Sequence, residues 1–114
     1  MIRGGIVMLK VSYVGRAVRF YVETLGMKLV DEAADGSAVI DAGEGFLIAL
    51  QAGKGDAVGV SGVAITFYPK VPIDEAIAIY ENRGVTFATE RTDRVVTARF
   101  CDPDANPLCL TQAV

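Results

Sequence analysis

The most informative feature of this 114-residue sequence is an absence, because it contains no histidine. Histidine is the usual proton shuttle near neutral pH and the usual base beside a serine or cysteine nucleophile, so its absence excludes these catalytic classes. Its imidazole is also the most frequent protein ligand for transition metals. Any catalysis by this chain would therefore depend on carboxylate, tyrosine, lysine or cysteine side chains.

Other scarcities narrow the protein class. The two cysteines, Cys101 and Cys109, are too few for a disulfide framework or a zinc knuckle, so we expect reduced thiols. No apolar run approaches the roughly 20 residues that cross a bilayer, and the first residues lack a signal-peptide core. The net charge of -3, with scattered basic residues, disfavours nucleic acid. We expect a cytoplasmic protein that binds neither membrane nor nucleic acid.

The patterns that are present occur twice in the same order. Residues 6–11 predict a strand, 17–25 a helix ending at Gly26, and 28–32, 37–41 and 46–51 three further strands. After a glycine-rich segment, a strand at 63–68, a helix from Ile73 to Gly84 and strands at 85–89, 95–101 and 108–112 repeat that order. We therefore predict an α+β fold of two tandem βαβββ modules, residues 5–52 and 62–113. A linker at 53–61 joins them within a single domain, 1–114.

In each module the helix is expected to cover one face of the sheet. Side chains alternate across a strand, so apolar alternates such as Leu9, Val11, Ile48 and Leu50 should face the helix. Tyr21 and Tyr80, on the helices, should also pack in the core. The uncovered face then carries small, polar and flexible side chains, which are typical of a binding cup: Ile6, Met8, Lys10, Leu47, Ala49, Gln51, Ala64, Thr66, Tyr68, Cys109 and Thr111.

Two segments resemble a known family. AVRFYVETLGMKLV, from Ala17, resembles the first helix and turn of the vicinal oxygen chelate (glyoxalase/bleomycin resistance protein/dioxygenase) superfamily. ARFCDPDANPLCLTQ, from Ala98, resembles its last hairpin, and the similarity spans nearly the whole chain. The resemblance implies the glyoxalase/bleomycin resistance fold, with curved, antiparallel-rich sheets. The family usually has glycine where Ala105 stands, so a positive φ there would cost about 1 kcal/mol.

The resemblance also implies where a metal would bind. The metal enzymes of the family place four ligands on the uncovered faces, and motif spacing carries these positions onto Ile6, Ala49, Ala64 and Cys109. Three of these side chains have no ligand atom, and one thiol does not hold a divalent metal against water. We therefore expect no metal and no cofactor, and metal-dependent activities are poorly supported.

The metal-free members implied by the resemblance are similar to bleomycin-resistance proteins, which bind an antibiotic as homodimers without chemistry. We expect a homodimer that sequesters an aromatic small molecule, with the acidic rim at Asp31 and Glu32 favouring a cationic one. The facing of Arg99 depends on how strand 95–101 begins. The expected ligand-binding residues are Met8, Lys10, Tyr13, Ala49, Gln51, Ala64, Thr66, Tyr68, Arg99, Cys109 and Thr111.

Two alternatives stay open at this point. The first is a metal-independent enzyme of the lyase or isomerase type that uses Lys10, Tyr68 or Cys109 as acid, base or nucleophile; a cysteine nucleophile would need a depressed thiol pKa. The second is a non-catalytic dimerisation or regulatory module.

Overall fold

The computed structural model describes residues 1, 5–53 and 65–114 and divides into two compact units, Met1–Ser61 and Gly62–Val114. Each unit contains a four-stranded mixed sheet and a helical segment in the order βαβββ, which confirms the predicted fold class. The predicted linker, from residue 54 onward, lies outside the described residues. So do Val63 and Ala64, at the start of the fifth predicted strand.

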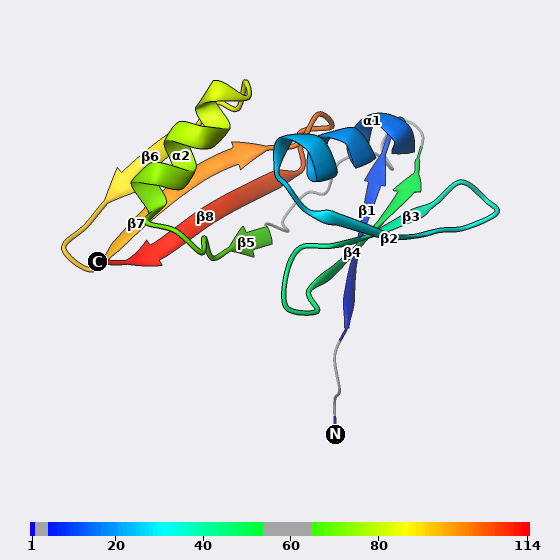
Figure 1. The fold of residues 1–114 in the computed structure, drawn as a ribbon, viewed down its shortest axis with the longest axis horizontal. Helices are drawn as coiled ribbons and strands as arrows, with labels where there is room; N and C mark the ends of the chain where they lie inside the picture. The colour runs from blue at the N-terminus through cyan, green and yellow to red at the C-terminus, as the bar shows by residue number, and fades with distance from the viewer. Residues whose placement is uncertain (2–4, 54–64) are drawn as a thin grey trace. The chain divides into compact units, whose positions relative to one another are not determined.

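The first unit consists of β1 (Ile6–Val11), α1 (Val14–Arg19) with the π-helical turn η1 (Phe20–Thr24), β2 (Lys28–Glu32), β3 (Ala38–Asp41) and β4 (Leu47–Ala52) (Figure 1). The strand order is β1-β4-β3-β2, with β1 parallel to β4 and the other pairs antiparallel. The helix is wider at its end than an α-helix, because Leu25 N donates to Phe20 O at 3.0 Å, five residues back. It ends at Gly26, whose φ of 79° is the predicted left-handed conformation.

The second unit consists of β5 (Ile65–Phe67), α2 (Ile73–Asn82), β6 (Ala88–Arg91), β7 (Val95–Cys101) and β8 (Pro107–Ala113). Its order, β5-β8-β7-β6, repeats that of the first unit, and Figure 1 shows α2 lying along one face of the sheet. The prediction of a strand at 85–89 was wrong in position. Val85 N donates to Tyr80 O at 3.1 Å, so Val85 lies buried in the turn that follows α2, and β6 begins only at Ala88.

The core lies between each sheet and its helix, as the alternation predicted. In the first unit Leu9, Val11, Ile48, Leu50 and Tyr21 are all 2% exposed or less. In the second unit the buried alternates follow the same rule and pack under Ile73 and Ala76 of α2: Ile65, Val96, Ala98, Leu108 and Leu110. The opposite face of each sheet is therefore free of core packing against a helix.

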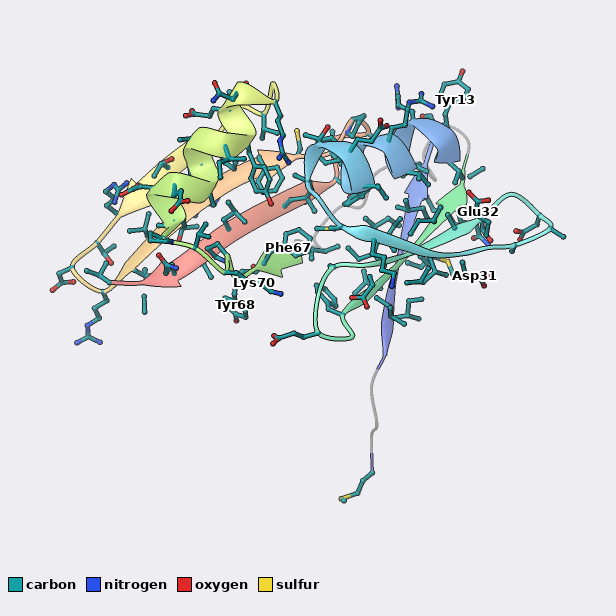
Figure 2. The ribbon with its side chains drawn as sticks, viewed as in Figure 1. Tyr13, Asp31, Glu32, Phe67, Tyr68 and Lys70 are labelled. Carbon is teal, nitrogen blue, oxygen red and sulfur yellow. The ribbon has the colours of Figure 1, made fainter. Side chains whose placement is uncertain are left out.

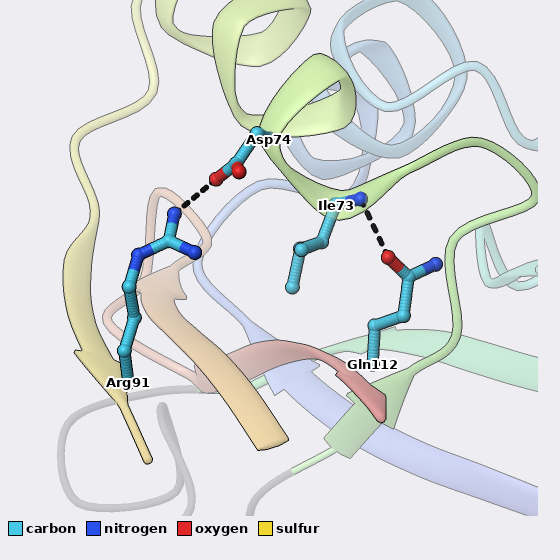
Figure 3. Close-up of polar contacts among 4 residues, drawn as sticks. All are labelled: Ile73, Asp74, Arg91 and Gln112. Atoms are coloured by element: carbon cyan, nitrogen blue, oxygen red, sulfur yellow. Dashed lines mark hydrogen bonds and ion pairs between the residues drawn. The ribbon is translucent and has the colours of Figure 1, made fainter. Parts of the chain in front are cut away.

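A side chain from the sheet caps the start of α2. The N-cap residue, Pro72, has no side-chain hydrogen-bonding group, and Gln112 of β8 takes that role (Figure 3). Ile73 N donates to Gln112 Oε1 at 2.8 Å, and Gln112 Nε2 donates to Val71 O at 3.2 Å. An exposed ion pair between Asp74 and Arg91 adds a second link from α2 to β6. These contacts fix α2 against the second sheet.

The turn between β7 and β8 is built around the buried carboxylate of Asp102. Its Oδ1 accepts hydrogen bonds from Asp104 N and Asn106 N, both at 2.9 Å, and its Oδ2 accepts one from Asn106 Nδ2 at 2.8 Å. Ala105 N donates to Asp102 O at 3.0 Å. This network holds Ala105 at a φ of 64°, the positive value considered from the sequence.

Candidate functional site

The uncovered face of the first sheet brings four of the predicted site residues together. The parallel register of β1 and β4 places Met8 opposite Ala49 and Lys10 opposite Gln51. Lys10 Nζ donates a hydrogen bond to Gln51 Oε1. Met8 is 53% exposed, whereas Leu9 and Val11 on the other face are buried. On this face the polar pair Lys10 and Gln51 therefore lies next to the flexible Met8 and the small Ala49.

The uncovered face of the second sheet carries four more predicted residues. Thr66 of β5 pairs with Cys109 of β8, and Cys109 pairs with Arg99 of β7. Arg99 alternates with the buried Ala98 and Phe100, so it points to the uncovered face, which answers the question the sequence left open. Its Nη1 lies 3.3 Å from Glu90 Oε1. Thr111 lies two residues further along β8, on the same face.

The remaining predicted aromatic residues lie outside the strands. Tyr68 follows the end of β5 and is 80% exposed, and in Figure 2 its side chain points away from α2. Tyr13 immediately precedes α1 and is 69% exposed, with Arg16 Cζ 5.6 Å from the centre of its ring. Ala64, the last predicted site residue, lies outside the described residues. Tyr13 is thus placed at a helix end rather than on the sheet face.

A β-bulge precedes the two acidic residues of the predicted rim. The register between β2 and β3 shifts at Val30, so that Asp31 pairs with Val39 and Glu32 pairs with the buried Ala38. Cross-strand partners share a face, so Asp31 belongs with Val39 and Ala49 on the uncovered side, and Glu32 belongs to the other. Both carboxylates are exposed (Figure 2).

The environment of Cys109 disfavours its ionised form. Burial raises the pKa of the Cys109 thiol, and the opposing effects of the Arg99 charge and of hydrogen bonds from Ala98 and Thr66 are smaller. The thiolate, not the thiol, is the nucleophile and the metal ligand. Cys109 is therefore a weak candidate for both roles near neutral pH.

Comparison with known proteins identifies the family. The model of the Glyoxalase/Bleomycin resistance protein/Dioxygenase superfamily matches residues 5–110. The chain belongs to this superfamily. No curated protein matches the sequence.

Solved structures of superfamily members share the fold. An antibiotic-binding protein, TnmS3 from Streptomyces sp. CB03234, is 22% identical, with a TM-score of 0.83 over 100% of this chain and 98% of that one. A superfamily member from Sphaerobacter thermophilus is 26% identical, with a TM-score of 0.80 over 97% of each chain. A glyoxalase/bleomycin resistance protein from the same Streptomyces is 23% identical, with a TM-score of 0.76 over 96% of this chain and 100% of that one.

The donor set at the superfamily's expected metal positions does not fit a divalent metal. Ile6 and Ala49 offer only hydrocarbon, as Ala64 does by its chemistry, and the Cys109 thiol resists ionisation. Within residues 5–53 and 65–114 no group of three Asp, Glu or Cys side chains is arranged to hold a metal ion. None of the helices in the same part of the chain is long and apolar enough to span a membrane.

The sequence did not reveal a hollow beside the start of β1. It has a volume of about 520 Å³ and is lined by Gly5, Ile6, Val7, Glu44, Gly45 and Phe46. Positive φ angles at Gly43, Glu44 and Gly45 shape the turn that forms one wall. Its single charged side chain offers few polar groups to orient a ligand, so it is a poorer candidate site than the uncovered face.

Proposed function

We propose that this superfamily member is a metal-independent binding protein that sequesters an aromatic small molecule as a homodimer. One observation carries the proposal: the face of each sheet away from its helix presents accessible, flexible and polar side chains instead of a close-packed layer. Ligand sites in proteins combine apolar surface with a few placed polar groups in this way. On the first sheet, Met8 and Ala49 supply apolar surface, and Lys10 and Gln51 supply polar groups. On the second sheet, Thr66 and Arg99 supply polar groups.

The chemistry of the residues supports binding without metal-assisted turnover. Ile6, Ala49 and Ala64 stand where the metal enzymes of the family carry ligands, and none has a donor atom. The raised pKa of Cys109 also weakens the case for a thiolate nucleophile. TnmS3 is described as an antibiotic-binding protein, and its shared fold supports the same type of function here.

Aromatic ligands suit the available contacts. Met8 is exposed and flexible, and thioether sulfur makes favourable contacts with aromatic rings. Tyr68 adds an exposed aromatic ring close to the end of β5. Asp31, at the β2 edge of the first uncovered face, would favour a cationic substituent at that edge.

A thermal-shift screen with aromatic metabolites and antibiotics tests the proposal, followed by calorimetry on each hit. Saturation at 100 times Kd adds about 2.7 kcal/mol to stability, so true ligands should raise Tm by several degrees. Binding should be unchanged by EDTA, and mass spectrometry should recover the ligand intact. Sedimentation should give a dimer.

A pair of variants links any hit to the uncovered face. Ala49→Leu fills the space beside Met8 and should weaken binding, whereas Ala52→Leu, at the exposed end of the same strand, should not. Sequestration is refuted if no compound raises Tm, or if the bound compound is recovered chemically altered.

A further inference from the structure

We propose that Lys10 and Gln51 form an anion-binding subsite, and that the ligand is an aromatic compound carrying one carboxylate. This inference rests on the proposed binding function and narrows the ligand class. It starts from the hydrogen bond between the two side chains, whose residues are direct partners across β1 and β4.

The hydrogen bond orients a cluster of donors. Gln51 Oε1 accepts from Lys10 Nζ, so the NH₂ end of the amide is directed away from the ammonium and is available to a ligand. The ammonium keeps further N–H groups of its own. Neither side chain makes another hydrogen bond or an ion pair with the described residues. A carboxylate can therefore accept from the ammonium and the amide together.

The positive charge of Lys10 has no carboxylate partner in the described part of the first unit. Asp31, on the uncovered face, lies three strands away, and at about 4.8 Å per strand the separation is roughly 14 Å. Asp35, in the turn before β3, accepts hydrogen bonds from Ser37 N and Ser37 Oγ at 2.9 and 2.7 Å. A ligand carboxylate would supply the missing negative charge.

The surface next to Lys10 and Gln51 indicates which chemical group the ligand carries beside its carboxylate. Met8, Ala49 and Val39 form a row across β1, β4 and β3, two residues along the strands from Lys10 and Gln51. This row is apolar, and the small Ala49 leaves space between two larger side chains. A single cation favours one carboxylate, because a second buried charge would be left unpaired. The complementary ligand is an aryl monocarboxylate.

Three probes with the same ring system test this inference by calorimetry on the intact protein: 1-naphthoate, 1-naphthamide and 1-naphthylmethylammonium. We expect naphthoate to bind about tenfold or more tightly than naphthamide, because a hydrogen bond between charged groups is stronger than a neutral one. Higher salt should reduce this preference.

Two substitutions locate the preference. Lys10→Met removes the charge and keeps an apolar stem, and Gln51→Glu places a carboxylate beside Lys10; each should abolish the naphthoate preference. Lys28→Met is the matched control, because it removes the same charge from β2, at the far edge of the sheet, and should leave the preference intact.

Three results would overturn the inference. The first is that the amide or the ammonium binds as tightly as naphthoate or more tightly. The second is a naphthoate preference that survives Lys10→Met. The third is that no naphthyl probe binds at millimolar concentration. In each case the broader proposal of an aromatic binder is judged separately, by the unbiased screen.

Discussion

Replacing Ala105 by glycine should stabilise the protein, although the change removes a methyl group and adds chain flexibility. Ala105 has a φ of 64°, in the left-handed region that disfavours residues with a Cβ. The residue cannot relax, because the Asp102 carboxylate accepts from Asp104 N and Asn106 N on either side of it, and Ala105 N itself donates to Asp102 O. Strain of this kind persists only where neighbouring contacts determine the conformation.

The size of the effect follows from two opposing terms. Relief of the left-handed conformation is worth about 1–2 kcal/mol. The greater freedom of glycine in the unfolded chain costs about 0.4–1 kcal/mol. We expect a net gain of about 0.5–1 kcal/mol, which corresponds to a rise in Tm of roughly 2–4 °C for a chain of this size.

Urea denaturation of wild type and variant at equal protein concentration measures this difference. Ala34→Gly is the matched control: it lies in the exposed turn before Gly36 and does not have a positive φ. There only the entropic term acts, so stability should fall by about 0.4–1 kcal/mol. If Ala105→Gly also lowers stability, the methyl group is not strained and the reasoning fails.

Three further predictions concern other parts of the chain. Gln112→Met should lower the free energy of unfolding, measured by urea denaturation, by about 1–2 kcal/mol, because α2 loses its cap. Asp74→Asn removes an exposed ion pair and should lower it by less than about 1 kcal/mol. Asp102→Asn should cost about 1–3 kcal/mol by the same assay, because an amide cannot accept all of the N–H bonds that converge on this buried carboxylate. Because burial raises the pKa of Cys109, iodoacetamide should modify it more slowly than the exposed Cys101 at pH 7.5. The rate of Cys109 modification should keep rising with pH above the ordinary thiol pKa. Peptide mass spectrometry that finds Cys109 modified first would contradict this prediction.

The sequence predicted the features that depend on local periodicity. The strands at 28–32 and 95–101 were correctly bounded. Turns flank the first of these strands, and buried apolar residues alternate with more exposed ones along the second. The burial of Leu9, Ile48 and Tyr21 followed from the same patterns. The repeated order of elements then determined the fold class, since few architectures accommodate two βαβββ modules.

Features set by contacts across the fold were missed. All four residues of β6 are exposed, so that strand has no alternation to detect, and the apolar Val85 drew the prediction toward the end of α2. The bulge at Val30, which places Asp31 rather than Glu32 on the uncovered face, depends on pairing with β3. The sequence placed Lys10 and Gln51 on one face, but their pairing depends on the parallel register of two strands 41 positions apart.

The positions along β1 also bear on the proposed function, which is binding without turnover. Metal enzymes of the family hold oxygen-bearing ligands through a cation that keeps an open coordination position. Along β1 of this chain the expected ligand position is Ile6, and a side-chain cation, Lys10, stands four residues further on the same face. An ammonium can donate hydrogen bonds to a carboxylate, but it offers no coordination position at which an oxygen could be activated. Under the proposed function, Lys10 would attract an oxygen-bearing ligand without supplying a Lewis acid.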